Sequence, residues 1–131
     1  MTPLSGHCLC GAICFELQGP SNWVGHCHCE SCRRATASPI TTFIGHPDGQ
    51  WRWSGEGTPV TYQSAPGVTR SFCGTCGSPI TYATASIPGE THFYAALLED
   101  PNAVTPTVHW HYDEHLDWPH IVDELTKRPQ G

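Results

Sequence analysis

Seven of the eight cysteines of this chain lie in three short clusters, and this spacing constrains the fold more than any other feature. The clusters read Cys8-x-Cys10, Cys27-x-Cys29-x-x-Cys32 and Cys73-x-x-Cys76. Close pairs and triples of thiols suit the ligands of one metal ion better than disulfide bridges between distant strands. We therefore expect metal sites. Disulfides and a redox-active Cys-x-x-Cys remain weaker alternatives, the latter because no βαβ pattern surrounds it.

Zinc is the metal that thiolate ligands favour, and its geometry explains the spacing. Tetrahedral Zn–S bonds of about 2.3 Å place two sulfurs roughly 3.8 Å apart, whereas alternate residues of a strand lie roughly 6.6 Å apart. A Cys-x-Cys pair must therefore bend, and Gly11, directly after Cys10, permits that bend. Gly74 and Gly77 give the turn at the third cluster the same freedom.

The two cysteine pairs together form one closed four-sulfur site. Its ligands would be Cys8, Cys10, Cys73 and Cys76. Such a site ties the N-terminal region to the middle of the chain. Because a closed site has no position for a substrate, it is structural and contributes folding free energy.

The remaining triple is predicted to hold a second zinc ion. Cys27, Cys29 and Cys32 supply three protein ligands and leave one position open, which is the pattern of a catalytic zinc site. Cys14 is left over. It alternates with the apolar residues of segment 12–17, so we expect a small, half-buried side chain without a metal.

Charge and hydropathy exclude other classes of function. The formal net charge is −6 with six lysines and arginines, so no basic stripe is present to bind nucleic acid. No apolar stretch approaches the ~20 residues that cross a membrane. The N-terminal segment lacks the basic and apolar parts of a secretory signal, so we expect a cytoplasmic protein with reduced thiols. The expected partner is a small molecule, and a homodimer stays open.

The pattern of turns predicts one mainly β domain over residues 1–131. Thirteen glycines and twelve prolines separate short segments of strand character. The predicted strands are 12–17, 22–26, 39–45, 50–54, 59–63, 68–72, 79–84, 91–98 and 106–112. Short helical turns are predicted at 30–35, which carries Cys32, and at 121–127. We expect a small sandwich or coiled sheets stapled by metal.

Four segments give the chain a resemblance to the glutathione-dependent formaldehyde-activating family. They are Gly6-His-Cys-Leu-Cys-Gly-Ala12, Cys27-His-Cys-Glu-Ser-Cys-Arg-Arg34, Ser64-Ala-Pro-Gly67 with Arg70-Ser-Phe-Cys-Gly-Thr-Cys-Gly-Ser-Pro79, and Leu98-Glu-Asp-Pro101. They occur in the family's order and cover about residues 6–120. Any single Cys-x-x-Cys is weak, but the combination is specific.

The resemblance implies a fold, two zinc sites and an activity. Family members fold as coiled antiparallel β-sheets around a structural zinc, here on the two cysteine pairs, with a second zinc on the triple. The family's activity joins formaldehyde to the thiol of glutathione, giving S-(hydroxymethyl)glutathione, and is classed as carbon–sulfur lyase chemistry. The alternatives for this chain are a non-catalytic zinc-binding interaction module and a zinc or thiol sensor.

The chemistry of the triple favours binding of a thiol. A zinc ion with an open position lowers the pKa of a bound thiol or polarises an aldehyde oxygen. Three thiolates donate strongly to the metal and weaken its Lewis acidity, so binding of the thiol is the preferred reading. Arg33 and Arg34 follow the third ligand, and either could hold a carboxylate of a glutathione-like thiol. The alternative is an ion pair with an acidic residue or a solvated side chain.

Histidines and tryptophans supply weaker candidates. His28 lies between two ligands and is expected to pack or face solvent rather than bind the metal. A third metal site would combine His109, His111, Asp113 and His115. Four tryptophans could line a pocket, but in a small protein they more often belong to the core: Trp51, Trp53, Trp110 and Trp118.

Overall fold

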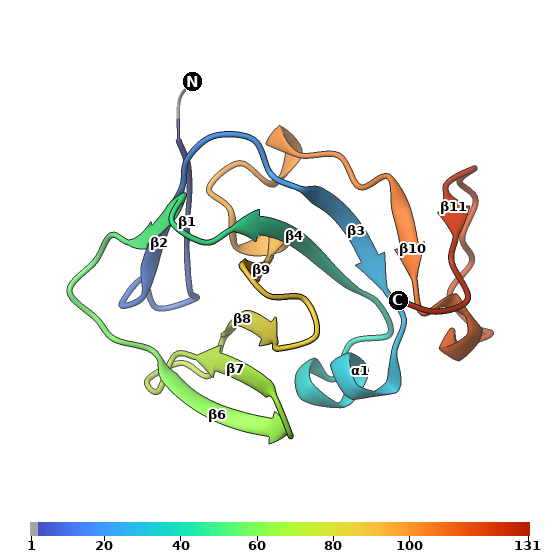
Figure 1. The fold of residues 1–131 in the computed structure, drawn as a ribbon, viewed down its shortest axis with the longest axis horizontal. Coiled ribbons are helices and arrows are strands. Elements are labelled where there is room, and N and C mark those ends of the chain that lie inside the picture. Colours follow the sequence, from blue (N-terminus) through green and yellow to red (C-terminus); the bar gives the residue numbers. More distant parts are fainter. Residues whose placement is uncertain (1–2) are drawn as a thin grey trace.

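Eleven strands form two sheets in residues 3–131, which are the residues that the computed structural model describes (Figure 1). The smaller sheet is antiparallel with the order β1-β2-β5, from β1 (Leu4–His7), β2 (Cys14–Leu17) and β5 (Trp51–Trp53). The larger sheet has eight strands in the order β11-β10-β3-β4-β9-β8-β7-β6. The mainly β fold predicted from the turns is therefore confirmed.

The larger sheet is antiparallel except where β10 lies parallel to β3 and to β11. Its strands are β3 (Trp23–Cys27), β4 (Thr41–Pro47), β6 (Val60–Ala65), β7 (Val68–Phe72), β8 (Pro79–Thr84), β9 (Glu90–Tyr94), β10 (Val108–Trp110) and β11 (Thr126–Lys127). One helix, α1 (Glu30–Thr36), connects β3 to β4. Short 3₁₀ turns cover Ala95–Leu97, Pro101–Ala103 and Tyr112–Glu114.

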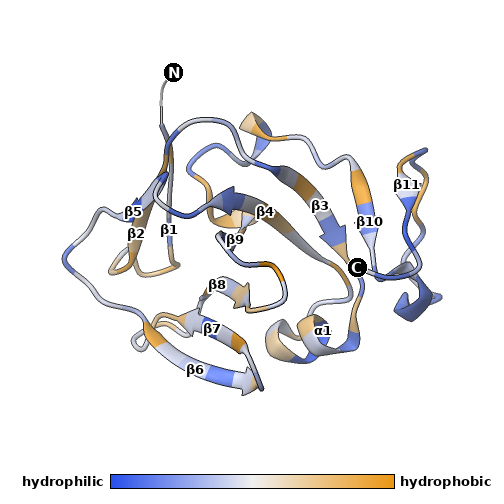
Figure 2. Cartoon of the chain, viewed as in Figure 1, coloured by the Kyte–Doolittle hydropathy of each residue, from blue (hydrophilic) through white to orange (hydrophobic). Residues whose placement is uncertain are grey.

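Alternation along the central strands gives the larger sheet two different faces. Ile44 and Phe93 are paired across β4 and β9 and belong to the main core, where Phe93 packs on Phe15 of the smaller sheet with ring centroids 4.7 Å apart. Their neighbours Phe43 and Tyr94 lie on the opposite face and form a second cluster with cysteines. In Figure 2 the shaft of β4 is orange to pale and its arrowhead is blue, since most of this central strand is buried on both faces.

Two of the predicted elements differ markedly from the structure, and most other predicted strands differ from the observed bounds by one or two residues. Segment 121–127 is not helical, because Leu125 N–H binds the Asp123 carboxylate at 3.1 Å and Thr126–Lys127 pair with β10. The strand predicted over 91–98 ends at Tyr94 and continues as a 3₁₀ turn. The strand at Leu4–His7 was not predicted. In the part of the chain that is described, no helix has both the length and the apolar character needed to cross a bilayer.

Candidate metal centres and the adjoining pocket

Two turns bring the paired cysteines together into a four-sulfur cluster. The Cys8 and Cys10 sulfurs are 3.7 Å apart, as are those of Cys10 and Cys73, and all four sulfurs lie within 4.8 Å of one another. The glycines after each pair, Gly11 and Gly77, have φ near 81°, and each closes its turn by donating to the first cysteine's carbonyl. These separations match a tetrahedral zinc site, where ligand sulfurs lie roughly 3.8 Å apart.

Backbone N–H groups aimed at the sulfurs prepare the cluster for a cation. Ile13 donates to the Cys8 sulfur at 3.3 Å, and Cys76 donates to the Cys73 sulfur at 3.5 Å. Hydrogen bonds with the Ser78 side chain and backbone lower the pKa of Cys76 to about 5. A backbone hydrogen bond from Ala12 favours the Cys10 thiolate, but desolvation and three neighbouring sulfurs outweigh it and raise the pKa of Cys10 to about 11. Without a metal the sulfurs thus share protons, which a zinc ion would displace.

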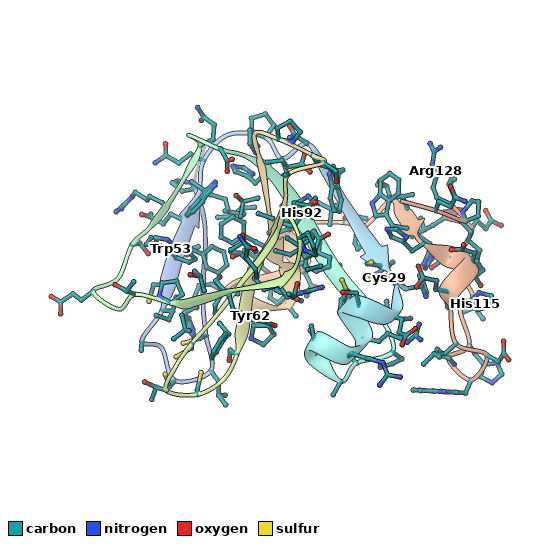
Figure 3. The ribbon with its side chains drawn as sticks, turned by 60° about the horizontal axis from the view of Figure 1, so that its bottom comes forward. Cys29, Trp53, Tyr62, His92, His115 and Arg128 are labelled. Atoms are coloured by element: carbon teal, nitrogen blue, oxygen red, sulfur yellow. The ribbon has the colours of Figure 1, made fainter. Side chains whose placement is uncertain are left out.

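The three-cysteine cluster forms where β3 ends and α1 begins. Cys27 is the last residue of β3, Cys29 is the N-cap of α1, and Cys32 is buried within the helix. The Cys29 sulfur accepts from the N–H of Cys32 at 3.3 Å, so one ligand caps the helix that carries another. The helix ends at Ala37, whose left-handed backbone lets its N–H bind the Arg33 carbonyl. Figure 3 shows Cys29 at this junction, away from the other group of sulfur atoms.

The donor set of this cluster also fits zinc. The three sulfurs lie within 4.8 Å of one another, and the described residues add no further histidine, aspartate or glutamate ligand to the group. Soft thiolates select zinc over harder cations, and three of them leave a position for a ligand from outside. Both predicted groups of cysteines are therefore found together, and Cys14 lies outside both, half-buried with its thiol donating to the Gly11 carbonyl.

A buried arginine supports the three-cysteine cluster. Arg70 is only 3% exposed, and its guanidinium donates to the Cys32 sulfur at 3.7 Å, to Ser31 at 2.9 Å and to Tyr94 at 3.3 Å. Hydrogen bonds from Cys27 and Cys29, with the charge of Arg70, lower the pKa of Cys32 to about 3 against the effect of burial. Hydrogen bonds to Cys29 and Cys32 raise the pKa of Cys27. Arg70 therefore favours the thiolate form of Cys32, which is the form that binds a metal.

The same three cysteines line a cavity of about 370 Å³ on the second face of the larger sheet. Its other walls are mainly apolar and come from β3, β4, β8 and β10 together with the loop before β9: Trp23, Phe43, Tyr82, Trp110 and Ile87. His92, labelled in Figure 3, lines it from β9 and stacks on Tyr82 with ring centroids 5.4 Å apart. A metal ion bound by the three cysteines would therefore face the aromatic walls of this cavity.

Two glycines make room for the indole rings of Trp23 and Trp110, which form part of the cavity wall. A Cβ atom on Gly45 would overlap the Trp23 ring, and one on Gly25 would lie 2.9 Å from Trp110 Nε1. Both rings therefore lie against the backbone of a neighbouring strand, in T-shaped contact with each other at 5.8 Å. Trp110 Nε1 is a buried donor that has no hydrogen-bond partner within the described residues.

The buried carboxylate of Glu90 places a negative charge on the wall of the cavity. Glu90 accepts from Asn22 at 2.8 Å, from Trp23 Nε1 at 2.9 Å and from His92 Nε2 at 2.7 Å. Burial opposes ionisation of Glu90, but these hydrogen bonds outweigh it and lower its pKa. Burial lowers the pKa of His92, which keeps the imidazole neutral against the opposing effect of Glu90.

Arg33 and Arg34 lie on α1 and make contacts with the protein. Arg33 Nη1 donates to the carbonyls of His28 and Glu114 at 2.9 and 2.7 Å. Arg34 pairs with Glu30 one helical turn earlier at 2.8 Å, and both side chains are exposed. Neither arginine lines the cavity. Their role toward a substrate carboxylate stays a prediction.

Histidines behind the cysteine triple form a packed network. His28 is 1% exposed, its Nε2 lies 2.8 Å from Nδ1 of His109, and His109 Nε2 lies 3.1 Å from Asp123. This agrees with the packing role expected for His28. His109 therefore does not join His111, Asp113 and His115, with which the sequence suggested a third metal site. The group that the structure brings together there is His111, Asp113 and Glu114, at the surface.

The tryptophans divide between the core and the cavity. Trp51 and Trp53 pack against the main core, as expected, whereas Trp118 is 66% exposed. Trp110 lines the cavity together with Trp23, which the sequence did not single out. Sequence reasoning also missed Glu90, His92 and the role of Arg70. Arg70 lies in one of the segments that carry the family resemblance, three residues before Cys73, and this position was the one available signal.

Comparison with known proteins agrees with this geometry. A family model described as "Glutathione-dependent formaldehyde-activating enzyme" matches residues 3–114. Among solved structures, the crystal structure of a Rhodobacter sphaeroides protein is similar, with a TM-score of 0.61 and 26% sequence identity. That match covers 76% of this chain and 93% of the other. No curated protein matches the chain significantly.

Proposed function

Since this chain belongs to the glutathione-dependent formaldehyde-activating family, we propose that it is a zinc-dependent carbon–sulfur lyase or synthase acting on a thiol–aldehyde adduct. The observation that carries the proposal is the three-cysteine cluster on the wall of a cavity of about 370 Å³. A zinc ion on Cys27, Cys29 and Cys32 would keep a thiol ionised at neutral pH or polarise a carbonyl oxygen. The four-cysteine cluster, whose four sulfurs already make up a tetrahedral donor set, is assigned the structural zinc.

The reaction needs no redox partner. In the synthetic direction the thiol sulfur forms a bond to the aldehyde carbon, the carbonyl π bond breaks, and the proton of the thiol passes to the oxygen. The lyase direction reverses these steps. With formaldehyde and glutathione, the family's named substrates, the product is S-(hydroxymethyl)glutathione.

The chain's own residues hold and shield the reacting groups. Arg70 compensates the charge of Cys32 and fixes its sulfur, while the aromatic walls limit the access of water. Arg33 and Arg34 remain the candidates for holding a carboxylate of the thiol, with Arg34 the more available because its guanidinium is exposed. Arg34→Ala should then raise the KM for glutathione, and an unchanged KM would remove Arg34 from the proposal.

Replacing Cys29 by serine tests the proposal. We expect native mass spectrometry to find two zinc ions in the parent protein and one in Cys29→Ser. Acceleration of adduct formation over the spontaneous reaction, followed by NMR with formaldehyde and either glutathione or benzyl mercaptan, should be lost in the variant. The matched control is Cys14→Ser, because Cys14 belongs to neither cluster.

The outcome separates three functions. Undiminished acceleration in Cys29→Ser with only one zinc bound would contradict the proposal. Two zinc ions that no thiol perturbs, without acceleration, would favour the non-catalytic interaction module. A second zinc that leaves on mild oxidation, again without acceleration, would favour the zinc or thiol sensor.

A further inference from the structure

We propose that the cavity beside the three-cysteine cluster selects a thiol whose organic group is uncharged and apolar, such as an aromatic ring, over a thiol that carries a carboxylate. This inference rests on the proposed function and names the substrate class of the same site. It follows from what the cavity walls are made of and from where the charges lie around them.

The walls offer an aromatic surface on several sides. Trp23 and Trp110 lie against Gly45 and Gly25, while Phe43 and Tyr82 come from two further strands. Burying apolar surface is favourable by about 25 cal/mol per Å², and aromatic pairs add to this when they meet edge to face or offset. A ring attached to the sulfur would have such neighbours. A hydrated peptide would lose water there without equivalent partners.

The charges around the cavity disfavour a carboxylate. No lysine or arginine is among the lining residues of the described chain, and the acidic side chain on the wall is Glu90. His111, which lines the cavity together with Gly131, lies 3.5 Å from the carboxylate of Glu114. Arg70, in contact with Cys32 and with the ring of Tyr82, is 3% exposed and already bound to Ser31, Tyr94 and Cys32. A carboxylate inside the cavity would therefore meet like charge without a lysine or arginine partner, because Arg33 and Arg34 lie outside the cavity. An unpaired carboxylate is disfavoured in such a site.

Ile87 offers a way to reverse this preference. It lines the cavity from the loop between β8 and β9 and is 44% exposed, so a longer polar side chain fits there without loss of the core. Ile87→Lys would place a cation at the cavity wall. The matched control is Val122→Lys, because Val122 is 97% exposed and lines a different cavity near β10 and β3.

The test compares two thiols of the same shape. Benzyl mercaptan and 4-(mercaptomethyl)benzoate differ by one carboxylate, and glutathione is measured beside them. The protein is loaded with cobalt in place of zinc, because the sulfur-to-cobalt absorption band reports a fourth sulfur at the three-cysteine site. Isothermal titration of the zinc form gives the dissociation constants and the heat-capacity change, which is negative when apolar surface is buried.

We expect benzyl mercaptan to bind at least about tenfold more tightly than either carboxylate-bearing thiol. Ile87→Lys should reduce this ratio at least about threefold, and Val122→Lys should leave it unchanged. Equal or tighter binding of 4-(mercaptomethyl)benzoate or glutathione, with a shifted cobalt band, would overturn the inference while the proposed function stands. A band that no thiol shifts would overturn the proposed function and this inference with it.

Discussion

At the scale of single residues, the contact between Arg70 and Cys32 distinguishes the three-cysteine cluster from the four-cysteine one. The guanidinium is buried, lies 3.7 Å from the Cys32 sulfur and sits over the Tyr82 ring at 4.8 Å from its centroid. Three thiolates and one zinc ion carry a net charge of −1, so a buried cation beside them balances the site. Hydrogen bonds to charged groups of this kind are stronger than neutral ones.

Arg70→Gln should weaken the zinc affinity of the three-cysteine site by about 10- to 100-fold, the usual effect of removing a partner of a metal ligand. Competition with a chromophoric chelator measures this, and the four-cysteine site should keep its zinc. Arg70→Lys, which retains the charge, should recover part of the loss. Arg52→Gln is the control, because Arg52 pairs with Glu16 on the smaller sheet. Equal losses in the Arg70→Gln and Arg52→Gln variants would exclude the electrostatic explanation.

At the scale of elements, the cavity depends on how closely β3, β4 and β10 approach one another. The register places Trp23 opposite Gly45 and Gly25 opposite Phe43, so large and small residues alternate across the pair. The parallel pairing of β10 with β3 then sets Trp110 beside Cys27. One wall of the cavity and one metal ligand are therefore fixed by the same ladder of backbone hydrogen bonds.

Gly45→Ala should disrupt this wall. The new methyl group would displace the Trp23 indole and break its hydrogen bond to Glu90, because Gly45 lies directly beneath the ring. We expect a loss of about 1–3 kcal/mol in the free energy of unfolding, measured in urea, and weaker near-ultraviolet circular dichroism from tryptophan. Gly55→Ala, in an exposed loop where the added atom would meet Cys14 at 3.3 Å, should change both far less. Matching effects of the two substitutions would argue against a specific role for Gly45.

At the scale of the whole molecule, the four-cysteine cluster joins the two sheets. Cys8 follows β1 of the smaller sheet, Cys73 follows β7 of the larger sheet, and both belong to the main core. The core is small, so a bound metal would supply a substantial part of the folding free energy. The three-cysteine cluster instead connects β3 to α1 within one local segment.

Cys76→Ser should therefore destabilise the protein more than Cys29→Ser does, because it opens the site that joins the sheets. We expect a loss of more than about 4 kcal/mol for Cys76→Ser and of less than about 1 kcal/mol for the control Cys14→Ser. Urea unfolding of the zinc-loaded proteins, with metal content measured in parallel, gives both values. A Cys76→Ser variant as stable as Cys14→Ser would show that the four-cysteine site is not structural.

The sequence determined the local features of this protein. The glycine after each cysteine pair indicated the turns, and alternation along 12–17 separated Ile13 and Phe15 from Cys14. Strands 68–72 and 79–84 were predicted with their observed bounds, and the short helix that carries Cys32 was predicted to within one residue. Each of these features depends on residues that are close in sequence, where spacing and backbone preference suffice.

The tertiary structure decided everything that depends on contacts between distant segments. Segment 121–127 has acids early and a lysine late, as a helix would, yet only Thr126–Lys127 form regular structure, as a short strand paired with the edge of β10. Arg70 meets Cys32, and Trp23 meets Glu90, across separations of 38 and 67 residues. Charge and apolar character in a sequence do not state which partners a side chain will have. The register of the eight-stranded sheet supplies those partners, and with them the walls of the cavity.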